Sequence, residues 1–120
     1  MKSHKTNDTF LSHMIQAIQN IRAFTAALTF EHYTTDLVLI SAVERQFEIL
    51  GEAARRLPHD FKDQHPEISW QDIVDLRNVI IHQYDGIDQD IIWKIISSRL
   101  PKLEETLINI LESRKMDSDR

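Results

Sequence analysis

The sequence contains no cysteine, and only two glycines and three prolines among its 120 residues. The absence of cysteine excludes disulfide bonds, thiolate metal sites and thiol nucleophiles, and it fits a reducing cytosol. Few glycines and prolines leave few turns for a many-stranded sheet, which favours an all-helical fold. No stretch approaches the ~18 to 20 apolar residues of a membrane span, and no apolar run of the signal-peptide type follows the basic N-terminus. We therefore expect a cytoplasmic protein that does not enter a membrane.

The charge balance is acidic, with 19 acidic and 14 basic side chains and a formal net charge of -5. Because proteins that coat phosphate backbones are usually basic, this balance argues against such coating as the main activity. A local nucleic-acid site remains compatible with it. The histidines outside the segment discussed below lack the paired helical spacing of a zinc site, so we expect no metal centre and no cofactor. They are His4, His13, His32, His59 and His65.

Hydrophobic periodicity predicts one domain over residues 1–120, an antiparallel bundle of four to five helices. Helices are expected from Asp8 to Thr25, from after Thr35 to about Leu57, over residues 70–84, and from about residue 88 onward. Pro101 should kink the last stretch or divide it into two helices. Residues 30–35 are expected as a connection, residues 59–66 as a short helical turn or loop, and residues 115–120 as a frayed tail.

Several helix ends carry residues that predict capping. Thr34 and Thr35 offer N-cap oxygens to the helix that follows them, and Ser69 with Asp72 resembles a capping box. Residues 85–86, Asp followed by Gly, are expected to end the helix over 70–84. Gly51 lies inside the second long helix, where it most simply marks a close helix crossing.

The segment SWQDIVDLRNVIIHQYDG departs from the separation of apolar and polar faces. On a helical wheel, the apolar arc contains Trp70, Ile73, Val74, Ile80, Ile81 and Tyr84, and the opposite polar stripe contains Gln71, Asp75, Asn78 and His82. Arg77 lies near the centre of the apolar arc. A guanidinium placed there costs several kcal/mol unless its donors are paired. It therefore needs a partner, either a structural carboxylate such as Glu44, Glu48 or Glu52, or backbone carbonyls, an open cleft or an anionic ligand.

Arginine and histidine together suit the cleavage of RNA without a metal. The reaction needs a group that moves the 2'-hydroxyl proton and cations that stabilise the phosphorane, and His82 and Arg77 can supply them. Asn78 lies on the same helical face as His82 and can orient the imidazole or a phosphate oxygen. In a regular helix, however, Arg77 and His82 point about 140° apart. They converge only if the helix loosens near His82, if the side chains bend, or if a second protomer completes the site.

The residues RNVIIHQY resemble the R-x4-H-x-Y signature of HepT-type toxins in the HEPN superfamily. The similarity extends over nearly the whole chain, because an IxGEA motif at Ile49–Ala53 and a PEIxW motif at Pro66–Trp70 occur in the expected order and spacing. The resemblance implies a small all-α homodimer with a composite cleft at its two-fold axis. Such a cleft would bring an Arg77 and a His82 together, although the two side chains point apart within one chain.

The same resemblance implies an activity and a regulator. The chain would be the toxin of a toxin-antitoxin system, a metal-independent endoribonuclease with an RNA substrate. Arg77 would stabilise the transition state, His82 would act as general acid or base, and Asn78 would be a supporting donor. Tyr84 would accept AMP from a minimal nucleotidyltransferase antitoxin of the MntA type, which blocks the cleft.

Two other interpretations remain open. The chain is a non-catalytic helical adaptor that binds a nucleotidyltransferase, with Arg77 as an internal ion pair, or the motif binds nucleotide or RNA without cutting it. Glu52 is a candidate partner of Arg77 or of another arginine. Arg55 and Arg56 with Lys62 either extend an RNA-binding rim or are simply solvated.

Overall fold

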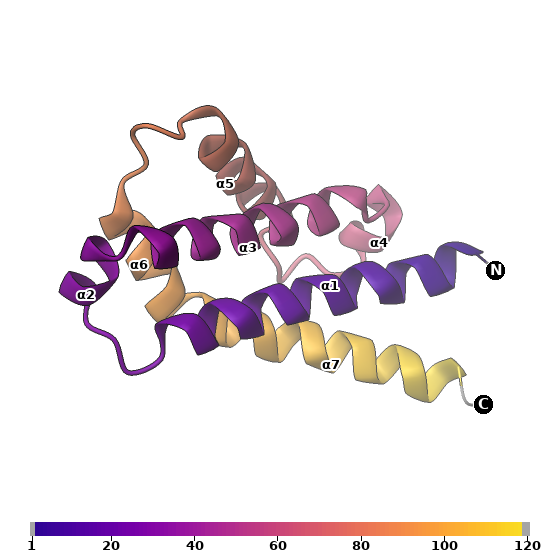
Figure 1. Ribbon diagram of the computed structural model, residues 1–120. Coiled ribbons are helices and arrows are strands. Elements are labelled where there is room, and N and C mark those ends of the chain that lie inside the picture. Colours follow the sequence, from indigo (N-terminus) through magenta and orange to yellow (C-terminus); the bar gives the residue numbers. More distant parts are fainter. Residues whose placement is uncertain (1, 119–120) are drawn as a thin grey trace.

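The computed structural model describes residues 2–118, with side chains over residues 6–117, and this part of the chain contains helices and no strand (Figure 1). The prediction of an all-α fold is confirmed. The helices are α1 (Lys2–Thr25), α2 (Phe30–Thr35), α3 (Leu37–Arg56), α4 (His59–Asp63), α5 (Trp70–His82), α6 (Gln89–Ser98) and α7 (Leu100–Ser118). No helix within residues 2–118 has the length and apolar content needed to cross a membrane.

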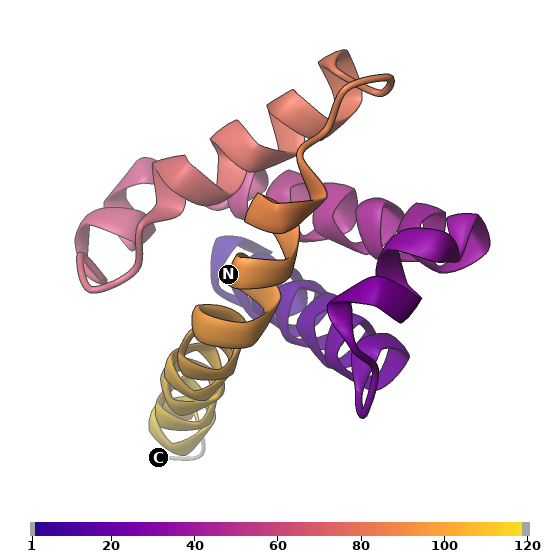
Figure 2. The ribbon, with the colours of Figure 1, turned by 90° about the vertical axis from the view of Figure 1, so that its left-hand side faces the viewer.

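Helix α1 lies between α3 and α7, which both run antiparallel to it (Figure 1). Helix α5 crosses the side of α3 that faces away from α1, so that α3 is packed between two helices (Figure 2). The molecule measures 50 × 29 × 22 Å. The first turn of α1 and the last turn of α7 lie at one end of the molecule, and the connection between α5 and α6 lies toward the other end (Figure 1).

The core forms from the apolar faces that the periodicity predicts on α1 and α3. Apolar residues spaced three and four apart predict one buried face on each of these helices. On α1 they are Leu11, Met14, Ile15, Ile18 and Ile21, and all are buried. On α3, Val43, Phe47, Leu50, Ala54 and the capping residue Leu57 are buried, and Ile40 on the same face is partly buried. Burial of each large aliphatic or aromatic side chain contributes about 1.5 to 3 kcal/mol. These two helices therefore form the rigid support on which α5 is placed.

The segment before α3 differs from the prediction, because residues 30–35 form a short helix instead of a connection. Thr29 caps it, and its hydroxyl accepts a hydrogen bond from the amide of His32 at 3.1 Å. Thr34 and Thr35 do not cap α3, because their hydroxyls donate to carbonyls within α2. The cap of α3 is Asp36, whose carboxylate accepts a hydrogen bond from a first-turn amide at 3.1 Å. A carboxylate such as that of Asp36 suits this position at the positive end of the helix.

Both ends of α5 differ from the prediction. Ser69 makes no capping hydrogen bond with its side chain, and the start of α5 is held instead by Trp70, whose indole Nε1 donates to the carbonyl of His65 at 3.0 Å. The helix ends at His82 and is capped by Gln83, so the expected cap at residues 85–86 is wrong. The amide of Gln83 donates to the carbonyl of Val79 at 2.8 Å, which closes the helix two residues before Tyr84.

The C-terminal part confirms the break near Pro101, where α6 and α7 are two consecutive helices that meet at Arg99. Helix α7 continues through Ser118, within the tail that was expected to fray, and residues 119–120 of that tail lie outside the described part. Helix α4 realises the expected helical turn after Pro58, whereas α1 starts at Lys2, earlier than the expected Asp8.

Helix α6 is attached to the rest of the molecule through a buried tyrosine. The Tyr33 hydroxyl donates to the amide oxygen of Gln89, and the Gln89 amide donates to Glu44 on α3 at 2.9 Å. The ring of Tyr33 lies 5.1 Å from that of Trp93, between their centroids. The connection of residues 83–88 is thus anchored at its α6 end, where Tyr33 and Glu44 hold Gln89.

Candidate active site

The crossing of α5 over α3 occurs at Gly51, which is buried. A Cβ atom added to Gly51 would lie 2.2 Å from Cβ and 2.8 Å from Cγ of Arg77, and 3.2 Å from the carbonyl oxygen of Ile73. Carbon atoms in contact normally lie about 3.5 to 4.0 Å apart, so no larger residue fits without moving α5. The predicted close crossing is confirmed, and its consequence is that the stem of Arg77 rests directly on the α3 backbone.

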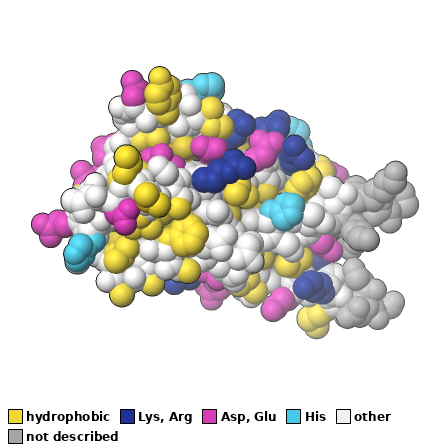
Figure 3. Space-filling model, in the orientation of Figure 1, with side chains coloured by type: hydrophobic (Ala, Val, Ile, Leu, Met, Phe, Trp, Pro, Cys, Tyr) yellow, Lys and Arg dark blue, Asp and Glu magenta, His cyan; other side chains and the backbone are white. Residues whose placement is uncertain are grey.

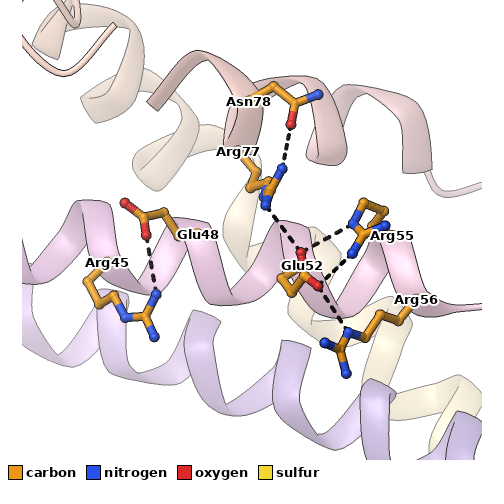
Figure 4. A network of polar contacts seen from close by, with 7 residues as sticks. All are labelled: Arg45, Glu48, Glu52, Arg55, Arg56, Arg77 and Asn78. Atoms are coloured by element: carbon orange, nitrogen blue, oxygen red, sulfur yellow. Dashed lines mark hydrogen bonds and ion pairs between the residues drawn. The ribbon is translucent and has the colours of Figure 1, made fainter. Parts of the chain in front are cut away.

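The guanidinium of Arg77 extends from α5 toward α3 and has two polar partners (Figure 4). Its Nη2 lies 3.4 Å from Oε1 of Glu52, and its Nη1 donates to Oδ1 of Asn78 at 2.8 Å. Its Nε is buried and has no hydrogen-bond partner. Of the three candidate carboxylates, Glu52 is therefore the partner, and the side chain keeps 26% of its surface exposed. Arg77 is held in place but is not enclosed.

Glu52 is also the partner of two arginines on its own helix. Arg55 donates from Nε and Nη2 to the two carboxylate oxygens at 3.2 and 2.8 Å, and Arg56 donates from Nε at 3.0 Å. The hydrogen bonds from Arg55 and Arg56, together with the charges of Arg55 and Arg77, lower the pKa of Glu52 from 4.5 to about 2. Glu52 is therefore ionised at any physiological pH. We call Glu52, Arg55, Arg56 and Arg77 the arginine cluster.

Each member of this cluster is a candidate from the sequence, but the sharing of one carboxylate by three arginines was not predicted. A signal was present, since Glu52 precedes Arg55 by three residues and Arg56 by four, the two spacings at which side chains meet on a helix. Figure 3 shows basic side chains, with acidic ones among them, over α3 and its crossing with α5. Lys62 does not extend this surface, because its ammonium donates to the carbonyl of Ala54 at 3.2 Å.

His82 and Tyr84 lie apart from Arg77, at the end of α5 and beyond it. His82 is exposed on the last residue of the helix, and Tyr84 is 83% exposed in the connection to α6. The wheel placed Tyr84 on the apolar arc of a helix over residues 70–84, but the helix ends at His82 and does not reach Tyr84. Helix α5 does not loosen near His82, and across residues 6–117 no hydrogen bond or ion pair joins His82 to Arg77.

The surface around His82 contains exposed apolar side chains. Val79 and Ile81 keep 39% and 37% of their surfaces exposed, and Tyr84 follows them in the connection to α6. Residues two apart on a helix do not face each other, so Val79 and Ile81 lie on different sides of α5. Arg77 points to α3, whereas His82 is exposed at the end of the helix. Within one chain, the predicted site residues are therefore brought onto one helix but not to one point.

A groove next to the crossing of α3 and α5 does not contain these residues. A groove of about 330 Å³ lies between α3, α5 and the α6–α7 junction, over Leu50, Ile73 and Leu103, and neither Arg77 nor His82 lines it. Across the described side chains there is also no group of three His, Cys, Asp or Glu residues placed to hold a metal ion.

Comparisons with known proteins show which family the chain resembles. A family model described as "Ribonuclease HepT-like" matches residues 14–110. "Probable ribonuclease HepT" of Thermococcus cleftensis is 38% identical over 103 residues, which cover 86% of this chain and 91% of that protein. "Putative RNase TTE0752" of Caldanaerobacter subterraneus subsp. tengcongensis is 34% identical over 111 residues, which cover 92% of this chain and 99% of that protein. No solved structure matches the chain at a significant level.

Proposed function

The chain belongs to the HepT-like ribonuclease family, and from this premise we propose that it is a metal-independent endoribonuclease in which Arg77 and His82 act on the scissile phosphate. The observation that carries the proposal is the placement of Arg77. Its stem is fixed against Gly51, its guanidinium is partly exposed, and its one ion-pair partner is a carboxylate that two other arginines also bind. A cation held in this way is ready to receive a phosphate.

Two copies of the chain are needed to complete the site. In one chain Arg77 and His82 lie on different sides of a regular helix, so that one phosphate cannot touch both. The exposed apolar side chains Val79, Ile81 and Tyr84, near His82 in the chain, offer surface for a second copy. We infer a homodimer in which His82 of one chain faces Arg77 of the other, and the substrate lies between them.

The chemistry follows from the properties of these groups. The 2'-oxygen of the substrate attacks the adjacent phosphorus, and the bond from phosphorus to the 5'-oxygen breaks, which leaves a 2',3'-cyclic phosphate and a 5'-hydroxyl. His82 accepts the 2'-hydroxyl proton or donates one to the leaving 5'-oxygen. Arg77 stabilises the charge that develops on the phosphorane oxygens. Asn78 holds Arg77 through its amide oxygen, and its amide nitrogen is available as the supporting donor.

Tyr84 is the proposed site of regulation. Its side chain is 83% exposed and lies outside α5, so a modifying enzyme reaches the hydroxyl without unfolding a helix. Transfer of AMP from ATP by an MntA-like nucleotidyltransferase antitoxin would form a phosphodiester on the tyrosine oxygen and release pyrophosphate. The added negative charge and bulk, two residues from His82, would oppose the entry of RNA. In this proposal the chain is the toxin of a toxin-antitoxin pair.

A second candidate is a non-catalytic adaptor that binds a nucleotidyltransferase. The observation in its favour is the Arg77–Glu52 ion pair at 3.4 Å, which a purely structural arginine would also form. The two candidates differ in what the loss of Arg77 does. If the chain is the adaptor, Arg77→Ala loses stability. If the chain is the ribonuclease, Arg77→Ala also loses RNA cleavage, and the variant remains folded.

The test compares RNA cleavage in EDTA by the wild type, Arg77→Ala, His82→Ala and the control Arg45→Ala, using protein whose intact mass shows no added AMP (~329 Da each). We expect cleavage by the wild type and the control, with products ending in 2',3'-cyclic phosphate, and a loss of at least 100-fold in the other two. His82 is exposed, so thermal melts should show His82→Ala as stable as the wild type. Equal cleavage by all four proteins, or none by the wild type, would contradict the ribonuclease.

Mixing the two inactive variants tests the shared site. If each site takes Arg77 from one chain and His82 from the other, a dimer of Arg77→Ala with His82→Ala contains one intact site. Unfolding and refolding the variants together should then restore activity that neither variant shows alone. No recovery, with mixed dimers verified by mass, would show that the site does not combine Arg77 and His82 from different chains.

A further inference from the structure

The arginine cluster is unusual in its charge balance. The ion pairs Arg22–Glu104, Arg45–Glu48 and Lys102–Glu105 join one base to one acid. In the arginine cluster, one carboxylate serves three guanidinium groups. The cluster therefore carries an excess of two positive charges on a protein whose formal net charge is -5.

The extra cations lie next to Arg77. Nε of Arg55 and Nη2 of Arg77 both contact Oε1 of Glu52, at 3.2 and 3.4 Å, so the two guanidinium groups lie within the span of about one nucleotide. Arg55 and Arg56 keep 53% and 57% of their side-chain surfaces exposed. Arg56 also lies 6.0 Å from the ring centroid of Phe10, a contact that orients its guanidinium without neutralising it. The charges are thus both fixed and accessible.

We propose that Arg55 and Arg56 form a second phosphate subsite, which binds a backbone phosphate of single-stranded RNA adjacent to the scissile phosphate. The proposal rests on the ribonuclease function, because Arg77 defines the scissile position. A strand whose scissile phosphate contacts Arg77 brings a flanking phosphate to Arg55 and Arg56. These contacts carry no information about base identity, since they reach only the backbone.

Glu52 is the group that holds this subsite together. Two guanidinium groups adjacent on one helix repel each other, and the shared carboxylate draws both toward Arg77. Since its pKa is lowered to about 2, the carboxylate stays charged when RNA binds. The phosphate neutralises the excess positive charge of the arginine cluster. Phosphate binding and the internal ion pairs are therefore compatible.

The test uses Arg55→Gln and Arg56→Gln with Arg45→Gln as the matched control. Arg45 is also on α3, is 68% exposed, and pairs with Glu48 through the same three-residue spacing, but it lies outside the cluster. Each substitution removes one charge, so a general electrostatic effect is equal in all three. The probe is a ten-nucleotide oligonucleotide of mixed sequence, made once as RNA and once as DNA, which lacks the 2'-hydroxyl and is not cleaved.

Binding of the DNA oligonucleotide is measured by fluorescence anisotropy between 25 and 200 mM salt. We expect Arg55→Gln and Arg56→Gln each to weaken binding about three- to tenfold at low salt and to lower the slope of log K against log salt by about 0.7, the value for one phosphate contact on a single strand. Arg45→Gln should change neither. With the RNA oligonucleotide, the loss should appear mainly in KM.

The outcomes separate the subsite from the function. If the wild type cleaves RNA but Arg55→Gln and Arg56→Gln behave as Arg45→Gln does, the subsite is refuted and the ribonuclease stands. If the wild type does not cleave RNA, but binding of the DNA depends on Arg55 and Arg56, the ribonuclease is refuted, and Arg55 and Arg56 bind phosphate without a scissile position next to them. A wild type that shows no salt-dependent binding of the DNA also refutes the subsite.

Discussion

Replacing Gly51 with alanine perturbs the crossing of α3 and α5 that positions Arg77. On an exposed helical surface this substitution stabilises a protein by about 0.5 to 1 kcal/mol, because alanine loses less backbone entropy on folding. Here the new methyl group would lie 2.2 Å from Cβ of Arg77 and 3.2 Å from the Ile73 carbonyl oxygen. Neither atom can move by a side-chain rotation, since both are fixed by the backbone of α5. The helices must therefore separate by more than 1 Å at this point, as judged from ordinary carbon contacts of about 3.5 Å.

The expected cost follows from these opposing effects. Overpacking costs about 1 to 3 kcal/mol, and the gain in helix propensity offsets less than 1 kcal/mol of it. We expect Gly51→Ala to be less stable by about 1 to 2 kcal/mol, which lowers Tm by about 4 to 8 °C for a chain of this size. Separation of the helices also withdraws Arg77 from Glu52, so RNA cleavage should fall further than the stability change alone would cause.

The assay is urea and thermal unfolding at matched protein concentrations, because association with a second copy would make Tm depend on concentration. The control is Gly86→Ala. A Cβ on Gly86 would meet no atom within 4 Å, and its φ is not positive, so this variant should be as stable as the wild type or up to about 1 kcal/mol more stable. If Gly51→Ala is also as stable as the wild type, the close crossing does not exist as described.

Three further substitutions test other parts of the structure. Burial, and then the charge of Glu44, raise the pKa of the Tyr33 hydroxyl above its ordinary value of 10. The protonated hydroxyl therefore contributes its full share of the folding stability below pH 10, and this share falls as the pH rises further. Tyr33→Phe should flatten the Tm profile between pH 9 and pH 11.5. The pKa of Glu52 is lowered from 4.5 to about 2. Its contribution to the folding stability is therefore complete above pH 4.5 and is lost as the pH falls through 2. Glu52→Gln should lose this part of the acid dependence in a pH titration of unfolding. Asp36→Ala should cost about 1 kcal/mol in urea unfolding because it removes the cap of α3, whereas Ser69→Ala, which removes no capping bond, should change stability little.

Each of these three has an outcome that contradicts its premise. An unchanged alkaline profile in Tyr33→Phe would mean that the hydroxyl is not buried, and an unchanged acid profile in Glu52→Gln would mean that the arginines do not bind the carboxylate. Equal costs for Asp36→Ala and Ser69→Ala would contradict the assignment of the caps. Circular dichroism at the starting pH verifies that each variant is folded.

The sequence predicted the long helices well because their apolar positions repeat over several turns. The faces of α1 and α3 are buried as the spacing indicates, and the division near Pro101 follows from the geometry of proline. The errors lie where two local hydrogen bonds compete. Thr34 and Thr35 face the carbonyls of α2 and not the amides of α3, and only the folded chain decides between these two uses of a hydroxyl.

The candidate site was predicted in part for a similar reason. The pattern of residues 77–84 singled out Arg77, Asn78, His82 and Tyr84 as candidates, and residue type alone suggested that Glu52 pairs with an arginine. The wheel placed Tyr84 on the helix because it extended the helix beyond His82, where the chain has already turned away. The sharing of Glu52 by three arginines depends on the contact between Gly51 and Arg77, which brings the two helices together. No periodicity within one helix contains that information.

The position of the helix ends determines how the protein can be labelled for measurement. The last turn of α7 lies at one end of the 50 Å molecule, and the connection carrying Tyr84 lies toward the other end (Figure 1). A biotin or fluorophore on the exposed side chain of Lys115, in the last turn of α7, is therefore remote from this connection. Immobilisation through Lys115 leaves the C-terminal end of α5 accessible to RNA and to a second copy, whereas immobilisation through a residue of the α5–α6 connection would cover it.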